Sequence, residues 1–164
     1  MKTLYLVRHA KTVEGSPDLK DFDRYLKPRG ISDSRVMASL MKKNSWLPET
    51  IITSPAKRAR QTAELFCEIF QYSHERIVEE KSLYYGGQVE MIDLLQNISN
   101  DSESVMIIGH NPTIHEVVNY LVGYGIEHYP TCAVSGLRFN INLWIEITLK
   151  KGELLFFEVP KNIR

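Results

Sequence analysis

Three short polar segments each follow an apolar run that has the length of a buried strand. Arg8 and His9 follow "TLYLV", His110 follows "SVMIIG", and the segment "SPAKRARQTA", which contains Arg58, follows "TIIT". The carboxyl ends of parallel strands meet at one edge of an open sheet, so we expect these side chains to converge. Gathering two arginines is costly unless an anion neutralises them. Phosphate fits, because a guanidinium binds two of its oxygens at once.

Two expected helix starts lie at the same edge. Ser54 is suited to cap the helix that follows it. The first turns of that helix carry Lys57, Arg58 and Arg60, and the helix dipole disfavours positive charge at this end. Either a solvated helix face or a bound anion explains these cations. Asn111 is expected to cap another helix just after His110, where free N–H groups favour anions.

The elements that must position these residues alternate between strand and helix. Apolar spacing predicts strands at 3–7, 50–53, 76–80 and 104–108, and helices from an N-cap at Ser32, over 55–70, over 88–98 and from Asn111 onward. After Cys132, strand patterns occur at 133–139, 143–149 and 154–159, the last two separated by the turn signal "KKGE". We therefore predict one domain over 1–164, an α/β/α three-layer sandwich with a mostly parallel sheet and an antiparallel edge.

Composition excludes several classes of protein. The chain has 164 residues and zero formal net charge, so nothing indicates broad binding of nucleic acid or anionic membrane. No apolar run has the length needed to span a bilayer, and no signal peptide precedes the first strand, which favours the cytoplasm. Two cysteines are too few for a disulfide framework. No cofactor or metal site is expected, and the oligomeric state is left open.

The three segments together resemble the histidine phosphatase superfamily, which includes the phosphoglycerate mutases. The motif of its first strand matches Arg8-His9-Ala10, its second matches Ser54, Arg58-Ala59 and Thr62-Ala63, and its third matches Gly109-His110. The loop "FDRYLKPRG" at 22–30 is similar to a further family segment. Within the superfamily, the short chain without insertions is most like the small bacterial phosphohistidine phosphatases.

The resemblance implies a mechanism. His9 would attack phosphorus and form a phosphohistidine intermediate, which water then hydrolyses. Arg8, Arg58 and a protonated His110 would hold the oxygens of the transferring group without a metal. The sequence does not identify the acceptor that orients the ring of His9. Among neighbouring residues, Lys11, Thr12 and Asn111 are candidates for substrate contact, although Lys11 and Thr12 fit a surface position equally well.

One departure from the family pattern bears on the substrate. Where many members carry a general acid Glu, this chain has Tyr85, and Glu79 and Glu80 stand at the wrong offset. An alkoxide needs an acid to leave, whereas a phosphorylated imidazole departs as neutral histidine. The sequence thus favours phosphohistidine on a protein as substrate. Glu79, Glu80 or solvent remains open as a proton source. The alternatives are a small-molecule phosphomonoesterase and a non-catalytic phosphate- or phosphoprotein-binding module.

Two other patterns are interpreted as coincidences. Cys132 and Arg138 have the spacing of a tyrosine phosphatase loop, but the residues that follow them predict a strand, whereas that loop must be followed by a helix. His115 and Glu116 begin a zinc-protease motif that lacks its second histidine, because position 119 is Asn. We expect Cys132 in the core and His115 on the rim of a helix.

Overall fold

One mixed sheet organises the chain. The computed structural model describes all residues from Met1 to Arg164. Six strands have the order β3-β2-β4-β1-β5-β6, and only β5 runs opposite to its neighbours. The strands are β1 Lys2–Arg8, β2 Thr50–Thr53, β3 Val78–Glu79, β4 Ser104–Gly109, β5 Val134–Phe139 and β6 Gly152–Glu158. The predicted mostly parallel sheet with antiparallel pairing toward one edge is confirmed.

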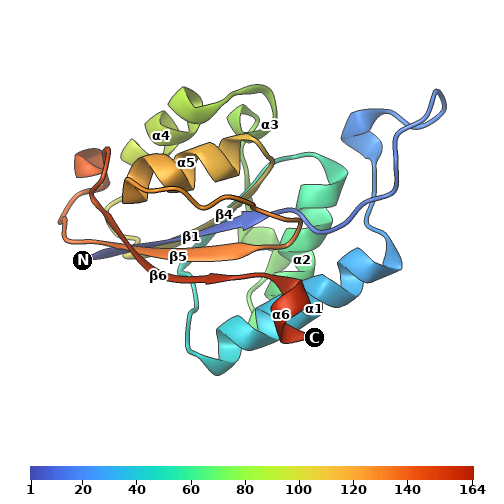
Figure 1. Ribbon diagram of the computed structural model, residues 1–164, viewed down its shortest axis with the longest axis horizontal. Helices are drawn as coiled ribbons and strands as arrows, with labels where there is room; N and C mark the ends of the chain where they lie inside the picture. The colour runs from blue at the N-terminus through green and yellow to red at the C-terminus, as the bar shows by residue number, and fades with distance from the viewer.

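Helices cover both faces of this sheet, as Figure 1 shows. They are α1 Pro28–Lys43, α2 Lys57–Phe70, α3 Ser82–Tyr85, α4 Gln88–Gln96, α5 Thr113–Val122 and α6 Pro160–Ile163, with short 3-10 turns η1 Asp21–Asp23, η2 His74–Arg76 and η3 Trp144–Glu146. α1 and α2 pack on one face, and α4 and α5 pack on the other. The predicted three-layer α/β/α fold is therefore confirmed. None of these helices combines the length and the apolarity that crossing a bilayer requires.

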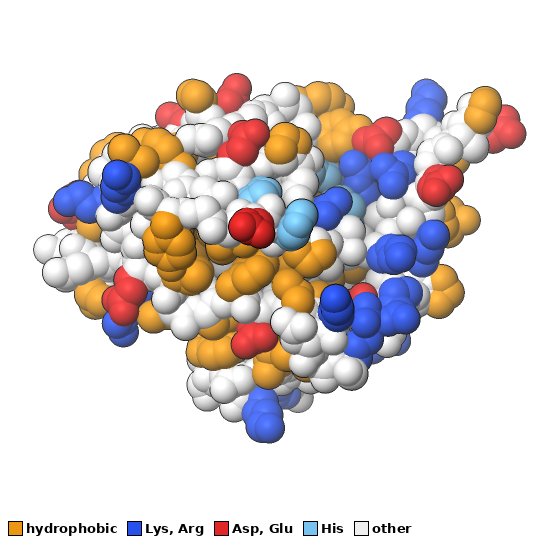
Figure 2. All heavy atoms as spheres, viewed as in Figure 1, with side chains coloured by type: hydrophobic (Ala, Val, Ile, Leu, Met, Phe, Trp, Pro, Cys, Tyr) orange, Lys and Arg blue, Asp and Glu red, His pale blue; other side chains and the backbone are white.

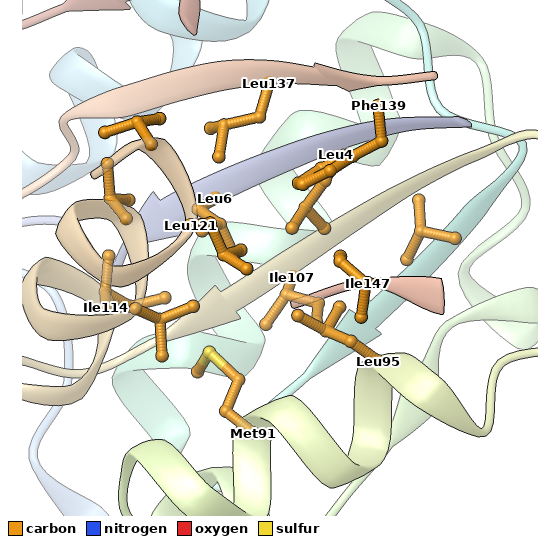
Figure 3. Close-up of a cluster of buried hydrophobic side chains, with 14 of the residues drawn as sticks. Leu4, Leu6, Met91, Leu95, Ile107, Ile114, Leu121, Leu137, Phe139 and Ile147 are labelled. Carbon is orange, nitrogen blue, oxygen red and sulfur yellow. The ribbon is translucent and has the colours of Figure 1, made fainter. Parts of the chain in front are cut away.

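Successive side chains of β1 point alternately toward the two helical layers and so contribute to both halves of the core. Leu4 and Leu6 point into the cluster beneath α4 and α5, which Figure 3 shows, and Tyr5 and Val7 point into the cluster beneath α1 and α2. Successive side chains of a strand face opposite sides, so a strand buried on both faces must be apolar throughout. The central position of β1 therefore explains why the residues before Arg8 are mostly apolar.

The predicted strand at 143–149 is wrong. The segment forms η3 and a loop, and β6 pairs with β5 rather than with this segment. Its fully buried residues, Trp144 and Ile147, are three positions apart, whereas a strand with one buried face needs a spacing of two. The indole N–H of Trp144 donates to the Ser102 carbonyl at 2.8 Å, which fastens the segment over the core.

The predicted helix start at Ser32 is also wrong. The N-cap is Lys27, five residues before Ser32, and α1 begins at Pro28, a residue favoured in the first turn because its fixed φ suits a helix and it needs no N–H there. Gly30 permits this start, since a Cβ atom there would lie 2.2 Å from the Lys11 carbonyl oxygen. The first turn of α1 therefore packs directly against the chain that leaves β1.

Candidate active site

Three adjacent parallel strands end at one place and deliver the site. In the registers of the sheet, Arg8 lies opposite Gly109 and Thr53 lies opposite Ile108, so β1, β4 and β2 end side by side. His9, His110 and Ser54 follow these ends. The rings of His9 and His110 are 5.2 Å apart between centroids, and His110 Nε2 is 2.8 Å from the Ser54 hydroxyl.

Backbone contacts fix the position of His9. Its N–H donates to the Gly109 carbonyl at 3.0 Å, and its carbonyl accepts from the Cys132 N–H at 3.1 Å. Its Nδ1 lies 2.8 Å from the Ala10 carbonyl oxygen. A carbonyl only accepts, so Nδ1 carries the hydrogen and Nε2 keeps its lone pair. The acceptor that the sequence did not identify is thus the backbone of the next residue.

Burial keeps His9 neutral. The residue is 7% exposed, and its pKa falls to about 3, first because burial disfavours the cation and then because His110, Arg58 and Arg8 repel it. The hydrogen bond to Ala10 opposes this shift but does not cancel it. At neutral pH the ring is an unprotonated base with a free lone pair on Nε2.

Both predicted arginines lie at the site with buried, unpaired N–H groups. Arg58 is 6% exposed and donates from Nη1 to the Asp21 carbonyl at 2.7 Å and from Nη2 to the Asp21 carboxylate at 3.1 Å. Arg8 donates from Nη1 to the Tyr129 carbonyl at 3.1 Å, and burial lowers its pKa. The Nε atoms of both arginines are buried without a hydrogen-bond partner. Such orphan donors are rare in proteins and are suited to an oxyanion.

Thr62, which the sequence marked only as part of a motif, links two of these elements. Its hydroxyl accepts from the Ala10 N–H at 3.0 Å and donates to the Arg58 carbonyl at 2.8 Å. The side chain thereby ties the chain after His9 to the first turns of α2. Ser54 is not the N-cap of that helix, which begins at Lys57 after Ala56. Its hydroxyl instead contacts His110 and accepts from the Ala56 N–H at 3.2 Å.

His110 is neutral in this structure, where the sequence led us to expect an imidazolium. Its pKa is lowered to about 4, mainly by burial and then by Arg58. Its Nδ1 is buried and unpaired. A phosphate dianion beside the ring would favour the charged form and raise this pKa. Protonation of His110 is thus tied to the presence of an anion.

Asp21 and Tyr84 belong to the site although the sequence gave no indication of them. The Tyr84 hydroxyl donates to Asp21 Oδ2 at 2.7 Å, and its ring packs edge-on against His110 at 5.6 Å. The pKa of Asp21 lies far below its ordinary value, first because of the Tyr84 hydrogen bond and then because of Arg24 and Arg58. Asp21 comes from a polar loop without periodicity, and only the fold brings it to Arg58.

The three candidates for substrate contact are placed differently. Lys11 is exposed, whereas Thr12 is 9% exposed and its hydroxyl accepts from Arg24 Nη2 at 2.7 Å. Asn111 does not cap α5, whose N-cap is Pro112. Its amide donates to the Tyr129 carbonyl at 2.8 Å, and its Oδ1 is buried without a partner. Asn111 and Arg8 therefore share one backbone acceptor.

The residues considered as proton donors are engaged or exposed. Glu79 pairs with Arg60 at 3.5 Å, and Glu80 accepts from the Ser82 hydroxyl at 3.3 Å. Tyr85 is 74% exposed and packs on the ring of Tyr84. Asp21 is the carboxylate that contacts Arg58, and its low pKa keeps it ionised.

Cys132 lies in the core, as expected. It is fully buried with a left-handed φ of 62°, and burial raises its pKa to about 12. Its N–H donates to the carbonyls of Arg8 and His9, and β5 begins two residues later. His115 is partly exposed and contacts the Ile126 carbonyl. No group of three or more His, Cys, Asp or Glu side chains is arranged to hold a metal ion.

Comparison with known proteins places this geometry in a family. The model for the histidine phosphatase superfamily (branch 1) matches residues 4–83. The SixA protein of Agrobacterium tumefaciens, provisionally described as a phosphohistidine phosphatase, has a TM-score of 0.84 and 26% identity, over 97% of this chain and 98% of that chain. The chain belongs to the histidine phosphatase superfamily.

Other relatives are similar over nearly their whole length. An uncharacterised protein of Mycobacterium leprae is 28% identical, over 94% of this chain and all of the relative. A protein histidine phosphatase SixA solved with tungstate has the same fold, with a TM-score of 0.84 at 22% identity over 99% of both chains. The motifs in this chain therefore occur in the fold that the superfamily uses, and the chain is a phosphatase of that superfamily.

The neutral histidines predict a pH-dependent stability. Unfolded histidines bind protons below pH about 6.5, whereas folded His9 and His110 bind them only near pH 3 and 4. The unfolded state thus holds more protons, so the free energy of unfolding falls as the pH drops below about 6.5. Urea unfolding at pH 7 and pH 5 should show a smaller difference in a His9→Asn/His110→Asn variant than in the native chain. Equal differences would contradict buried, neutral histidines.

Asp21 forms an ion pair with Arg58, which a bound anion would also contact. We therefore expect a substitution of Asp21 to change the affinity for phosphate. Replacing Asp21 by Asn removes a negative charge 3.1 Å from Arg58. Inorganic phosphate should then bind roughly two- to fivefold more tightly by calorimetry, in keeping with a partly exposed ion pair. Asp23→Asn, in the same 3-10 turn but without an ion pair, is the matched control. Weaker binding in Asp21→Asn would mean that Asp21 serves to orient Arg58.

Proposed function

We propose that this phosphatase removes the phosphoryl group from phosphohistidine on a protein, by way of a phosphorylated His9. The observation that carries the proposal is the pairing of His9 Nδ1 with the Ala10 carbonyl, which leaves a neutral Nε2 beside two arginines with unpaired N–H groups. A nucleophile must be unprotonated, whereas a module that only binds phosphate has no such need. Residues 1–164 would act as one catalytic domain without an inserted cap.

In the first step, the lone pair of His9 Nε2 forms a bond to phosphorus. The bond between phosphorus and the substrate nitrogen breaks, and its electron pair stays on that nitrogen. The substrate ring, protonated by solvent on its other nitrogen, leaves as neutral imidazole. Phospho-His9 keeps its hydrogen on Nδ1, so its ring is cationic, and the Ala10 carbonyl at 2.8 Å stabilises that charge.

In the second step, water attacks the phosphorus of phospho-His9. The bond from phosphorus to Nε2 breaks and returns its electron pair to Nε2, and the water oxygen with both hydrogens leaves as dihydrogen phosphate. Arg8, Arg58 and His110 would hold the oxygens in both steps, where positioning and electrostatics supply most of the catalysis. A phosphate dianion would raise the pKa of His110 so that it donates a hydrogen bond.

The surroundings of the site favour a leaving group that needs no acid. Asp21 is held ionised by Tyr84, Arg24 and Arg58, and Glu79 and Glu80 have other partners. Protonated phosphohistidine meets this condition, since its imidazole leaves uncharged, whereas a sugar alkoxide does not. Relatives described as phosphohistidine phosphatases support the same substrate. One of them was solved with tungstate, a tetrahedral oxyanion, which supports a phosphoryl site in this fold. A role in cytoplasmic signal transduction stays a prediction.

Turnover of two substrate classes tests the proposal. A chemically phosphorylated histidine phosphotransfer domain and a panel of sugar phosphates are incubated separately with the protein. We expect loss of phosphate from the phosphotransfer domain and little from the sugar phosphates. His9→Ala should abolish turnover, and Arg58→Ala should lower kcat by roughly 10²–10³, the loss typical of one oxyanion donor.

Two variants serve as controls in this assay. His74→Ala changes an exposed histidine in η2, outside the site, and should leave kcat unchanged. Glu80→Gln should also leave turnover of phosphohistidine unchanged, because solvent protonates the leaving ring. Turnover confined to the sugar phosphates, or substantial activity of His9→Ala, would reject the proposal.

A further inference from the structure

A basic groove adjoins the candidate active site and is not used by the proposed reaction. It lies between the start of α1, the chain after β1 and α6, and has a volume of about 390 Å³. Its cationic side chains are Lys11, Lys27, Arg29, Lys161 and Arg164. Figure 2 shows Lys and Arg side chains gathered over this region, beside the histidines.

The positive charge of this groove is largely uncompensated. The one acidic side chain that lines it, Asp33, is buried and bound to Arg164 Nε at 3.0 Å. The other four cations form no ion pair and no side-chain hydrogen bond, and the first turn of α1 carries no acidic residue. The whole chain has zero net charge, so this is a local excess. Like charges held close together repel one another. A binding partner with acidic side chains would reduce this repulsion.

The groove lies next to the candidate active site along the chain and shares a lining residue with a hollow at that site. Lys11 lies two residues after His9, and its carbonyl accepts from the Lys27 N–H at 2.9 Å. Pro130 lines both the groove and a second hollow of about 370 Å³, which Arg8 and Asn111 also line. A protein segment could thus place one residue beside His9 while its neighbours extend along the cations.

We propose that this groove docks an acidic segment next to the phosphohistidine of the substrate protein. The inference rests on the proposed function and adds a preference for Asp and Glu around the phosphorylated residue. Charge complementarity of this kind raises the association rate and selects among partners, and it weakens as salt rises. The reaction steps proposed above use none of the groove's cations.

Peptides and a small substrate separate docking from chemistry. Three phosphohistidine peptides carry acidic, neutral or basic residues around the same phosphohistidine, and phosphoramidate serves as a substrate too small to reach the groove. We expect kcat/KM to be highest for the acidic peptide, by roughly tenfold over the basic one at low salt, in the range of electrostatic steering. The preference should shrink at high salt.

Charge reversal locates the effect. The variant Lys27→Glu/Arg29→Glu/Lys161→Glu should lose the acidic preference and retain turnover of phosphoramidate. The control Lys42→Glu/Lys43→Glu/Lys151→Glu makes the same change at the far end of α1 and before β6, and should keep the preference. Circular dichroism and the unfolding midpoint establish that both variants are folded.

The outcomes distinguish the groove from the reaction. Equal turnover of all three peptides would overturn the docking role and leave the proposed function intact. Equal losses on phosphoramidate and on the acidic peptide in the groove variant would assign its cations to catalysis instead. Stronger inhibition by a short single-stranded RNA than by an unphosphorylated acidic peptide would assign the groove to nucleic acid. Failure to hydrolyse any peptide or phosphoramidate would refute the proposed function itself.

Discussion

The hydrogen bond between His9 Nδ1 and the Ala10 carbonyl is the contact on which the account of the site depends. It places the hydrogen on one ring nitrogen and so leaves the lone pair on the other. The chain after β1 is held on both sides, by Gly109 at the end of β4 and by Cys132 before β5, which fixes the backbone that carries both the ring and the Ala10 carbonyl.

The second constraint is the positive charge gathered at the site, which disfavours the folded state. Arg8, Arg58 and His110 bring donors into a mostly buried place where several of their N–H groups find no partner. Asp21 supplies one carboxylate to Arg58, with help from Tyr84. We propose that such a site binds an oxyanion by exchanging the Asp21 carboxylate on Arg58 for an oxygen of the anion. Burial keeps both histidines uncharged, and a bound anion would raise the pKa of His110 alone, so that His9 stays a neutral nucleophile.

The sequence was informative where a residue's role is set by the strand that precedes it. Apolar runs of strand length fixed the ends of β1, β2 and β4, and the edge at which Arg8, His9 and His110 meet follows from that. Prediction failed where contacts between residues far apart in the sequence determine the local structure. The strand predicted at 143–149 is a loop, because Trp144 turns inward to Ser102, and Ser32 lies inside a helix that Pro28 begins. Asp21 and Tyr84 could not be found, since nothing local marks a loop residue that pairs 37 positions away.

The atom that carries phosphorus in the trapped intermediate shows whether His9 Nε2 is the nucleophile. The protein, labelled with ¹⁵N in histidine, is quenched during turnover of phosphoramidate and examined by ³¹P and ¹⁵N NMR at alkaline pH, where phosphohistidine is stable. We expect one phosphorylated histidine, His9, with phosphorus bonded to Nε2. Phosphorus on Nδ1 of His9, or on His110, would contradict it.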